Sequence, residues 1–116
     1  MDFFIRKPKL PVLIDTGTEL LVAKTWATCE KRLAAVVFAD NEPLDVIDST
    51  AEGFSYYPDM KLFSPLTLKK RWTKAGIIKL YNERRGGDVP ENQPKSLGNK
   101  SLETVVKDVV ELLSAT

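Results

Sequence analysis

Residues 11–24, PVLIDTGTELLVAK, have the pattern of a β-hairpin. Two short runs rich in apolar residues, Pro11–Ile14 and Glu19–Lys24, lie on either side of Asp15-Thr16-Gly17-Thr18. A tight turn of this kind needs a residue with positive φ, and glycine adopts that conformation without steric cost. The sequence therefore predicts two antiparallel strands joined at Gly17.

Further strands follow the hairpin at the spacing of an antiparallel meander. Leu33–Ala39 is a continuous apolar run, which is typical of a buried central strand. After a turn at 40–43, Leu44–Asp48 alternates and predicts the next strand. Gly53 then interrupts the chain, and Phe54–Tyr57 forms another strand.

A last strand is predicted at Leu66–Trp72, where apolar and polar residues alternate. Leu66, Leu68 and Trp72 share one face of this strand. Lys70 falls on the same apolar face, which is tolerated where a strand lies at the edge of a sheet. We therefore place this strand at the edge.

The second half of the chain contains two helix signals. Thr73 can cap a helix that ends at Gly86-Gly87, with Trp72 and Ile77 on either side of the cap as a hydrophobic staple. Ser101 begins the clearest helix of the chain. An earlier helix of one or two turns, within residues 25–32 and capped by Thr25 or Thr28, is an open alternative.

The helix after Ser101 carries an unusually broad apolar stripe. Its members are Leu102, Val105, Val106, Val109, Val110, Leu112 and Leu113. Val105 and Leu112 lie near the edge of the stripe, whereas an intramolecular core can use Leu102, Val106, Val109 and Leu113. Exposed apolar patches commonly mark association sites. We therefore expect Val105 and Leu112 to form an interface with a second copy of the chain or with another protein.

Together these elements predict one α+β domain over residues 1–116. It consists of an antiparallel sheet of about five strands and two or three helices, with the C-terminal helix packed on the sheet. Residues 86–100 contain two prolines and three of the chain's six glycines, with no apolar periodicity. This segment is expected to be a flexible loop.

The composition weighs against an enzyme. The chain has no histidine and one cysteine, Cys29. Ser-His and Cys-His nucleophile pairs are therefore excluded, as are most metal sites built on imidazole. We expect no catalytic residues, no metal and no cofactor, and we interpret Cys29 as a spectator thiol.

The expected location is the cytoplasm. A single cysteine allows no internal disulfide, which suits a reducing compartment. The N-terminal sequence lacks the apolar core of a secretory signal, and no window approaches the ~18 apolar residues of a membrane span.

The charges are segregated along the chain, although the net charge is only +1. Residues 33–60 contain six acidic residues and no basic residue, whereas residues 61–85 contain eight basic residues and one acidic residue. Such a separation gives a molecule a strong local field and influences which partners it attracts.

Lys69-Lys70-Arg71-Trp72-Thr73-Lys74 is a basic patch with an aromatic residue inside it. Lys69, Lys70, Arg71 and Lys74 could bind phosphates or other anions, and a base could stack on Trp72. In the simpler interpretation Trp72 belongs to the core and the basic side chains face the acidic strands. Nucleic-acid binding by residues 69–79 remains the alternative function.

One short motif resembles a catalytic loop. Apolar residues followed by Asp15-Thr16-Gly17 and a small residue resemble the active-site loop of the aspartic proteases, and the chain length would suit a retropepsin-like homodimer. The resemblance implies a site in which two copies of Asp15 share one proton. It covers seven residues, and the second apolar loop and glycine-rich flap of that family are absent. A hairpin turn explains the same residues.

The favoured hypothesis is thus a small non-enzymatic cytoplasmic domain that works as a protein-interaction or accessory module. Its partner is a second copy of the chain or another protein. Nucleic-acid binding is the first alternative, and a retropepsin-like protease is a remote one.

Overall fold

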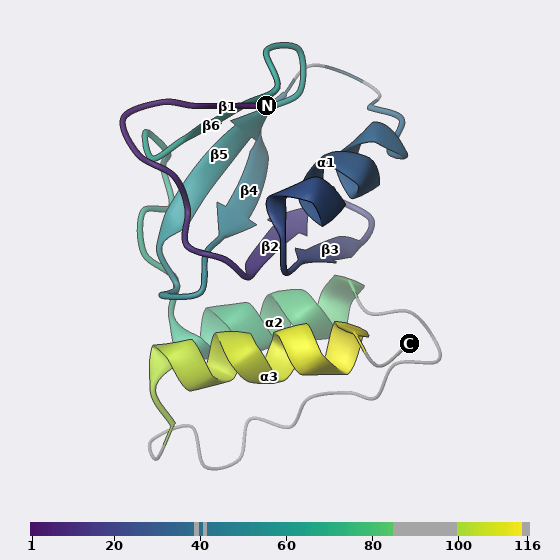
Figure 1. The fold of residues 1–116 in the computed structure, drawn as a ribbon. Helices are drawn as coiled ribbons and strands as arrows, with labels where there is room; N and C mark the ends of the chain where they lie inside the picture. Colours follow the sequence, from purple (N-terminus) through teal and green to yellow (C-terminus); the bar gives the residue numbers. More distant parts are fainter. Residues whose placement is uncertain (39, 41, 85–99, 115–116) are drawn as a thin grey trace.

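The chain folds into a mixed sheet with helices on both faces, as the computed structural model shows for residues 1–38, 40, 42–84 and 100–114 (Figure 1). The described residues form six strands and three helices. In chain order these are β1 (Asp2–Phe3), β2 (Val12–Asp15), β3 (Leu20–Ala23), α1 (Trp26–Ala34), β4 (Leu44–Ile47), β5 (Gly53–Tyr57), β6 (Leu62–Ser64), α2 (Lys74–Arg84) and α3 (Leu102–Ser114). The prediction of an α+β fold is confirmed.

The strand order is β1-β6-β5-β4-β2-β3. All neighbours are antiparallel except β1 and β6, which pair in parallel. The predicted five-stranded antiparallel meander is therefore a six-stranded mixed sheet. β4 pairs with β2 rather than with β3, the strand immediately before it, so β2 lies inside the sheet and β3 lies at its edge.

The predicted hairpin is confirmed. Val12 of β2 pairs with Ala23 of β3, and Asp15 pairs with Leu20 at the turn. Gly17 has φ +94°, and its backbone N–H donates a hydrogen bond of 2.9 Å to Asp15 Oδ1. The turn thus combines the freedom of glycine with an aspartate that hydrogen-bonds its own backbone.

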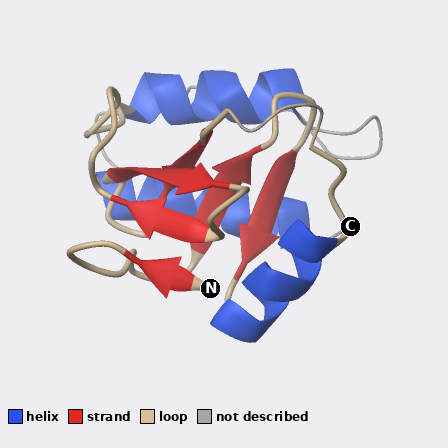
Figure 2. Cartoon of the chain, turned by 90° about the horizontal axis from the view of Figure 1, so that it is seen from above, coloured by secondary structure: helices blue, strands red, loops and turns tan. Residues whose placement is uncertain are grey.

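Two hydrophobic cores lie on opposite faces of the sheet. In Figures 1 and 2, α1 lies on one face, while α2 and α3 lie side by side on the other. Val12 and Ile14 belong to the core beneath α1, and Leu13 belongs to the core beneath α2 and α3. Each of these three side chains is at most 1% exposed. Burial on both faces explains why β2 is a continuous apolar run.

The predicted strand at Leu33–Ala39 is wrong in its described part. α1 continues to Ala34, and Val37 beyond it is almost fully exposed. Cys29 and Leu33 stand four residues apart on the buried side of the helix, so the apolar run ends a helix rather than forming a strand. Thr25 is the cap: its side chain accepts the Thr28 N–H at 3.1 Å.

The predicted edge strand at Leu66–Trp72 is also wrong. The strand is β6, at Leu62–Ser64, and within residues 66–72 the chain pairs with the sheet through an isolated bridge between Glu52 and Arg71. Leu66 is 57% exposed and Leu68 is fully exposed, whereas Trp72 is buried. Alternation along the sequence therefore does not reflect two faces of a strand here.

Backbone hydrogen bonds hold residues 70–72 against the start of β5 and the turn before it. Gly53 N–H donates to Lys70 O at 2.7 Å, and Trp72 N–H donates to Ala51 O at 3.0 Å. A Cβ atom on Gly53 would lie 1.6 Å from Lys69 O. Gly53 thus does not interrupt the chain, as its sequence position suggested, but lies within β5 where another backbone passes closely.

Asp48 fixes the turn between β4 and β5. Its side chain is buried, and Oδ1 accepts hydrogen bonds from Thr50 N–H at 2.8 Å and from Glu52 N–H at 3.0 Å. Its other oxygen, Oδ2, accepts the Lys9 N–H at 3.2 Å. A buried carboxylate with several donors is well compensated, so this turn is held in one conformation beside residues 69–72.

The helix starts are as predicted. Thr73 Oγ1 accepts the Gly76 N–H at 3.0 Å, and Ser101 Oγ accepts the Thr104 N–H at 3.1 Å. Trp72 and Ile77 lie in the same core. α3 packs on α2 and on the sheet, which confirms the predicted position of the C-terminal helix. The predicted helix stop at Gly86-Gly87 and the predicted loop, up to residue 99, lie outside the described residues.

Gly53→Ala should destabilise the protein severely, because the new methyl group would overlap the backbone of Lys69. We expect a loss of at least about 3 kcal/mol in the free energy of unfolding, measured by urea denaturation. Gly17→Ala is the matched control, since open space surrounds Gly17 and only its positive φ is penalised, by about 1–2 kcal/mol. Equal losses for the two variants would contradict the close approach at Gly53.

Candidate functional site

The predicted anion-binding residues lie in different environments. Lys70 and Arg71 are exposed, whereas Trp72 is 8% exposed and belongs to the core. Lys69 Nζ lies 4.7 Å from the centre of the Trp72 ring, and Lys74 is half-buried at the start of α2. With so little surface exposed, Trp72 offers no ring face for a stacked base. The interpretation of Trp72 as a core residue is the correct one.

Lys70 and Arg71 line a cavity of about 450 Å³, called here the basic cavity. Arg6 contributes a third cation and pairs with Glu52 on the same rim. Trp72 forms part of the wall, and its Nε1–H finds no acceptor among the described residues. The full lining is Arg6, Thr50, Ala51, Glu52, Lys70, Arg71, Trp72 and Leu102.

An apolar groove of about 550 Å³ lies next to the basic cavity. Two exposed leucines, Leu66 and Leu68, line the groove, and Tyr57 and Pro43 contribute further apolar surface. Large apolar side chains that are this exposed and close together are unusual on a free surface. The full lining is Pro43, Asp45, Ser55, Tyr57, Leu66, Thr67, Leu68 and Lys70.

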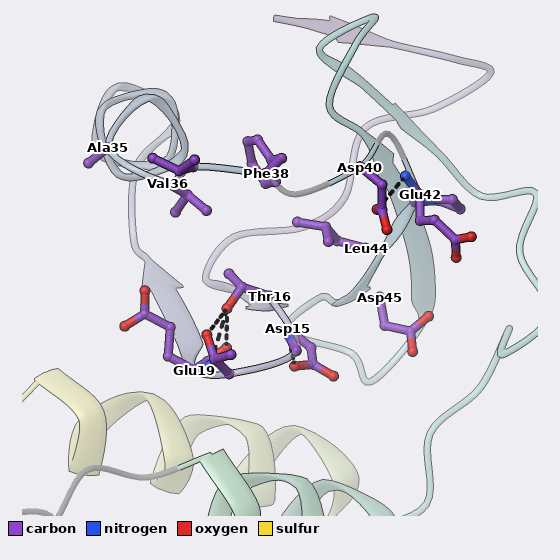
Figure 3. A pocket seen from close by; sticks show the side chains of 14 residues that line it. Asp15, Thr16, Glu19, Ala35, Val36, Phe38, Asp40, Glu42, Leu44 and Asp45 are labelled. Atoms are coloured by element: carbon purple, nitrogen blue, oxygen red, sulfur yellow. Dashed lines mark hydrogen bonds between the residues drawn. The ribbon is translucent and has the colours of Figure 1, made fainter.

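A third concavity, the acidic cavity, has a volume of about 600 Å³. Figure 3 shows Asp15 and Glu19 of the first hairpin on one side of it and Phe38 and Asp40 on the other. Glu42 and Asp45 add two more carboxylates. The acidic cavity has the opposite charge to the basic cavity.

The three concavities share lining residues and are therefore contiguous. Pro43 and Asp45 line both the acidic cavity and the apolar groove. Lys70 lines both the apolar groove and the basic cavity. The folded chain therefore carries one continuous surface that changes from acidic, through apolar, to basic. The segregation of charge along the sequence is thus also present on the surface. We call the three together the composite surface.

Asp15 has a partner within the chain. Its Oδ1 lies 2.9 Å from Arg84 Nε, and this hydrogen bond raises the pKa of the Arg84 guanidinium. Asp45 is the cross-strand neighbour of Asp15, so two carboxylates face each other on β2 and β4. Opposed like charges are unfavourable, and Arg84 compensates one of them. The contact also differs from the aspartic protease site, in which the carboxylate shares a proton with a second carboxylate.

Asp45 and Lys70 are left without such a partner. No hydrogen bond or ion pair joins the side chain of either residue to the rest of the described chain. Asp45 lies where the apolar groove joins the acidic cavity, and Lys70 lies where the groove joins the basic cavity. Sequence patterning singled out Lys70 but not Asp45, Leu66 or Leu68, because the groove that joins them exists only in the folded chain.

The predicted interface on α3 is only partly available. Val105 is 1% exposed and lies in the core, whereas Leu112 is partly buried and packs against that core. The stripe is wide because α3 contacts both α2 and the sheet. Val105 is therefore buried within the chain and does not lie at the exposed edge of the stripe.

Cys29 lies on the buried side of α1 and is fully buried. Burial and the charge of neighbouring Glu30 raise the pKa of its thiol to about 11. A raised pKa lowers the fraction of reactive thiolate, so the environment is that of a structural cysteine.

Comparison of the chain with protein-family models, curated proteins and solved structures gives no match. Among the described residues, no three His, Cys, Asp or Glu side chains are arranged to hold a metal ion. No helix in the described part of the chain is both long and apolar enough to cross a membrane.

Asp15→Asn should cost at most about 1 kcal/mol in the free energy of unfolding, because the pair with Arg84 is partly exposed and Asp45 is relieved of a neighbouring charge. The measurement is urea denaturation together with a peptidase assay at mildly acidic pH. A pepstatin-sensitive activity that this substitution abolishes would contradict our interpretation of Asp15 as a turn residue.

The Cys29 thiol should react slowly with thiol reagents at pH 8. Burial raises the pKa of this thiol from 9.0 to about 11, so its thiolate fraction is lower by about a hundredfold. As the pH rises, the thiol loses its proton at a lower pH in the unfolded chain than in the folded chain. The free energy of unfolding should therefore fall as the pH rises from about 9 to about 11. Cys29→Ala should reduce that fall. Rapid labelling of the native protein at pH 8 would show that the thiol is accessible.

Proposed function

We propose that this chain is a non-enzymatic protein-interaction module of the cytoplasm, and that the composite surface is its binding site. The observation that carries the proposal is the exposed pair Leu66 and Leu68 in a groove with unpartnered charges at both ends. A folded monomer gains nothing from leaving a leucine fully in water, whereas a bound protein would bury it.

The arrangement suits a protein better than a small molecule. The three concavities are contiguous, and together they offer apolar contact with charges of both signs at the margins. Interfaces between proteins have this anatomy, with an apolar centre and a polar rim. A small-molecule site is usually one enclosed pocket with a few convergent polar groups.

A nucleic acid fits the composite surface less well. Its backbone would favour Arg6, Lys70 and Arg71, but the acidic cavity at the other end would repel phosphates. Burial of Trp72 removes the stacking platform that single-strand binding commonly uses.

Leu68→Asp should abolish partner binding without unfolding the chain, because the side chain is fully exposed in the free protein. We would capture partners from the native host with the parent chain and with the variant. Ile5→Asp is the matched control: Ile5 is 71% exposed and lines none of the three concavities. Proteins retained by the parent and by Ile5→Asp should be lost with Leu68→Asp.

The outcome that would contradict the proposal is equally clear. If Leu68→Asp retains the same partners as the parent chain while Ile5→Asp loses them, the binding surface lies elsewhere. Circular dichroism of both variants should match that of the parent chain.

A further inference from the structure

The composite surface has a symmetry property that points to its partner. Its order is acidic, apolar, basic, with the leucines in the middle. When a copy of such a surface is rotated by 180° about an axis through the middle, its acidic end meets the basic end of the original. A two-fold interface is isologous, so each contact occurs twice.

We infer that the composite surface binds a second copy of this chain in a two-fold dimer, an inference that rests on the proposed function. Leu66 and Leu68 of one protomer pack on the same residues of the other. Asp45 of each protomer faces Lys70 of its partner. The dimer therefore contains two equivalent ion pairs, one at each end of the shared apolar groove.

Charge is the first argument for this arrangement. Asp45 sits half-buried opposite Asp15, and Arg84 compensates only Asp15. The carbonyl of Lys70 accepts a hydrogen bond from Gly53 N–H, which fixes the backbone at this position. The side chain of Lys70 has no acidic partner among the described residues. A second copy supplies both missing countercharges at once. Another protein would have to carry both charges at matching positions.

Apolar burial is the second argument. Leu68 is fully exposed and Leu66 more than half exposed, and both line the same groove as Asp45 and Lys70. In the two-fold arrangement the leucines cluster near the axis and the ion pairs lie at the rim. Energetically important residues are generally central, and charged pairs at the rim supply specificity.

Charge reversal tests the arrangement with the purified full chain. Asp45→Lys places two lysines opposite each other at both ends, and Lys70→Asp places two aspartates there. Each single variant should raise the dimer dissociation constant by at least about tenfold, as measured by sedimentation velocity.

The two single variants mixed in equal amounts should form a heterodimer. At one end of its groove, the lysine introduced at position 45 of one protomer meets the aspartate introduced at position 70 of the other. At the other end, the unchanged Lys70 of the first protomer meets the unchanged Asp45 of the second. Both ion pairs are thereby restored, although neither variant restores them alone.

The double variant Asp45→Lys, Lys70→Asp should dimerise with itself, because exchange of both charges restores both pairs. Its dissociation constant should lie within about threefold of the parent value, and dimerisation of both proteins should weaken as salt rises. Circular dichroism confirms that each variant is folded. Rescue by the mixture and by the double variant cannot arise from unfolding.

Two results would overturn the inference. One is a parent chain that is monomeric at high micromolar concentration. The other is a dimer that both single variants leave intact, which would place the contact on a different surface such as Leu112 of α3. The proposed function stands after either result if Leu68→Asp fails to capture the proteins that the parent chain retains. The composite surface would then bind a different protein.

Discussion

At Gly53 two backbones come so close that no side chain could stand between them, and the candidate site depends on this contact. It returns the chain to the sheet after β6 and fixes Lys70 through a hydrogen bond from Gly53 N–H to its carbonyl. Because residues 65–70 leave the sheet before that point, Leu66 and Leu68 face water instead of the core. The same contact sets Trp72 into the core and thereby positions the start of α2.

The rest of the fold supports that contact from both sides. Asp48 holds the β4–β5 turn against Lys9, which keeps Ala51 and Gly53 in place for their backbone bonds with residues 70–72. The first hairpin is buried on both faces, so β2 and β4 cannot change register without exposing apolar side chains. This fixed register places Asp45 opposite Asp15. Asp45 thereby lies where the apolar groove joins the acidic cavity.

Local signals predicted much of the architecture. The turn at Gly17 and the caps at Thr73 and Ser101 depend on neighbouring residues alone, and each is present in the structure. The errors at 33–39 and 66–72 have a different cause: an apolar run can end a helix, and an alternating run can be held by backbone contacts. The pairing of β1 with β6 joins residues about sixty positions apart and leaves no local signal.

The candidate site was less predictable than the fold. The sequence revealed the segregation of charge and the basic residues Lys70 and Arg71, because they are adjacent in the chain. It did not reveal that Asp45 and Lys70 frame the same groove, since that depends on how β4, β5 and residues 66–70 come together. Nor could it place Val105 in the core, because the width of an apolar stripe does not say how many elements pack on it.

The central proposal is that another protein chain covers the surface around Leu68 in the cell. The most direct test is a photo-crosslinking amino acid placed at position 68 in the native host, with the same group at position 5 as the control. The account predicts a protein adduct from position 68, whether to a second copy or to a different chain, and little or none from position 5. An adduct of equal yield at both positions, or one from position 5 alone, would contradict it.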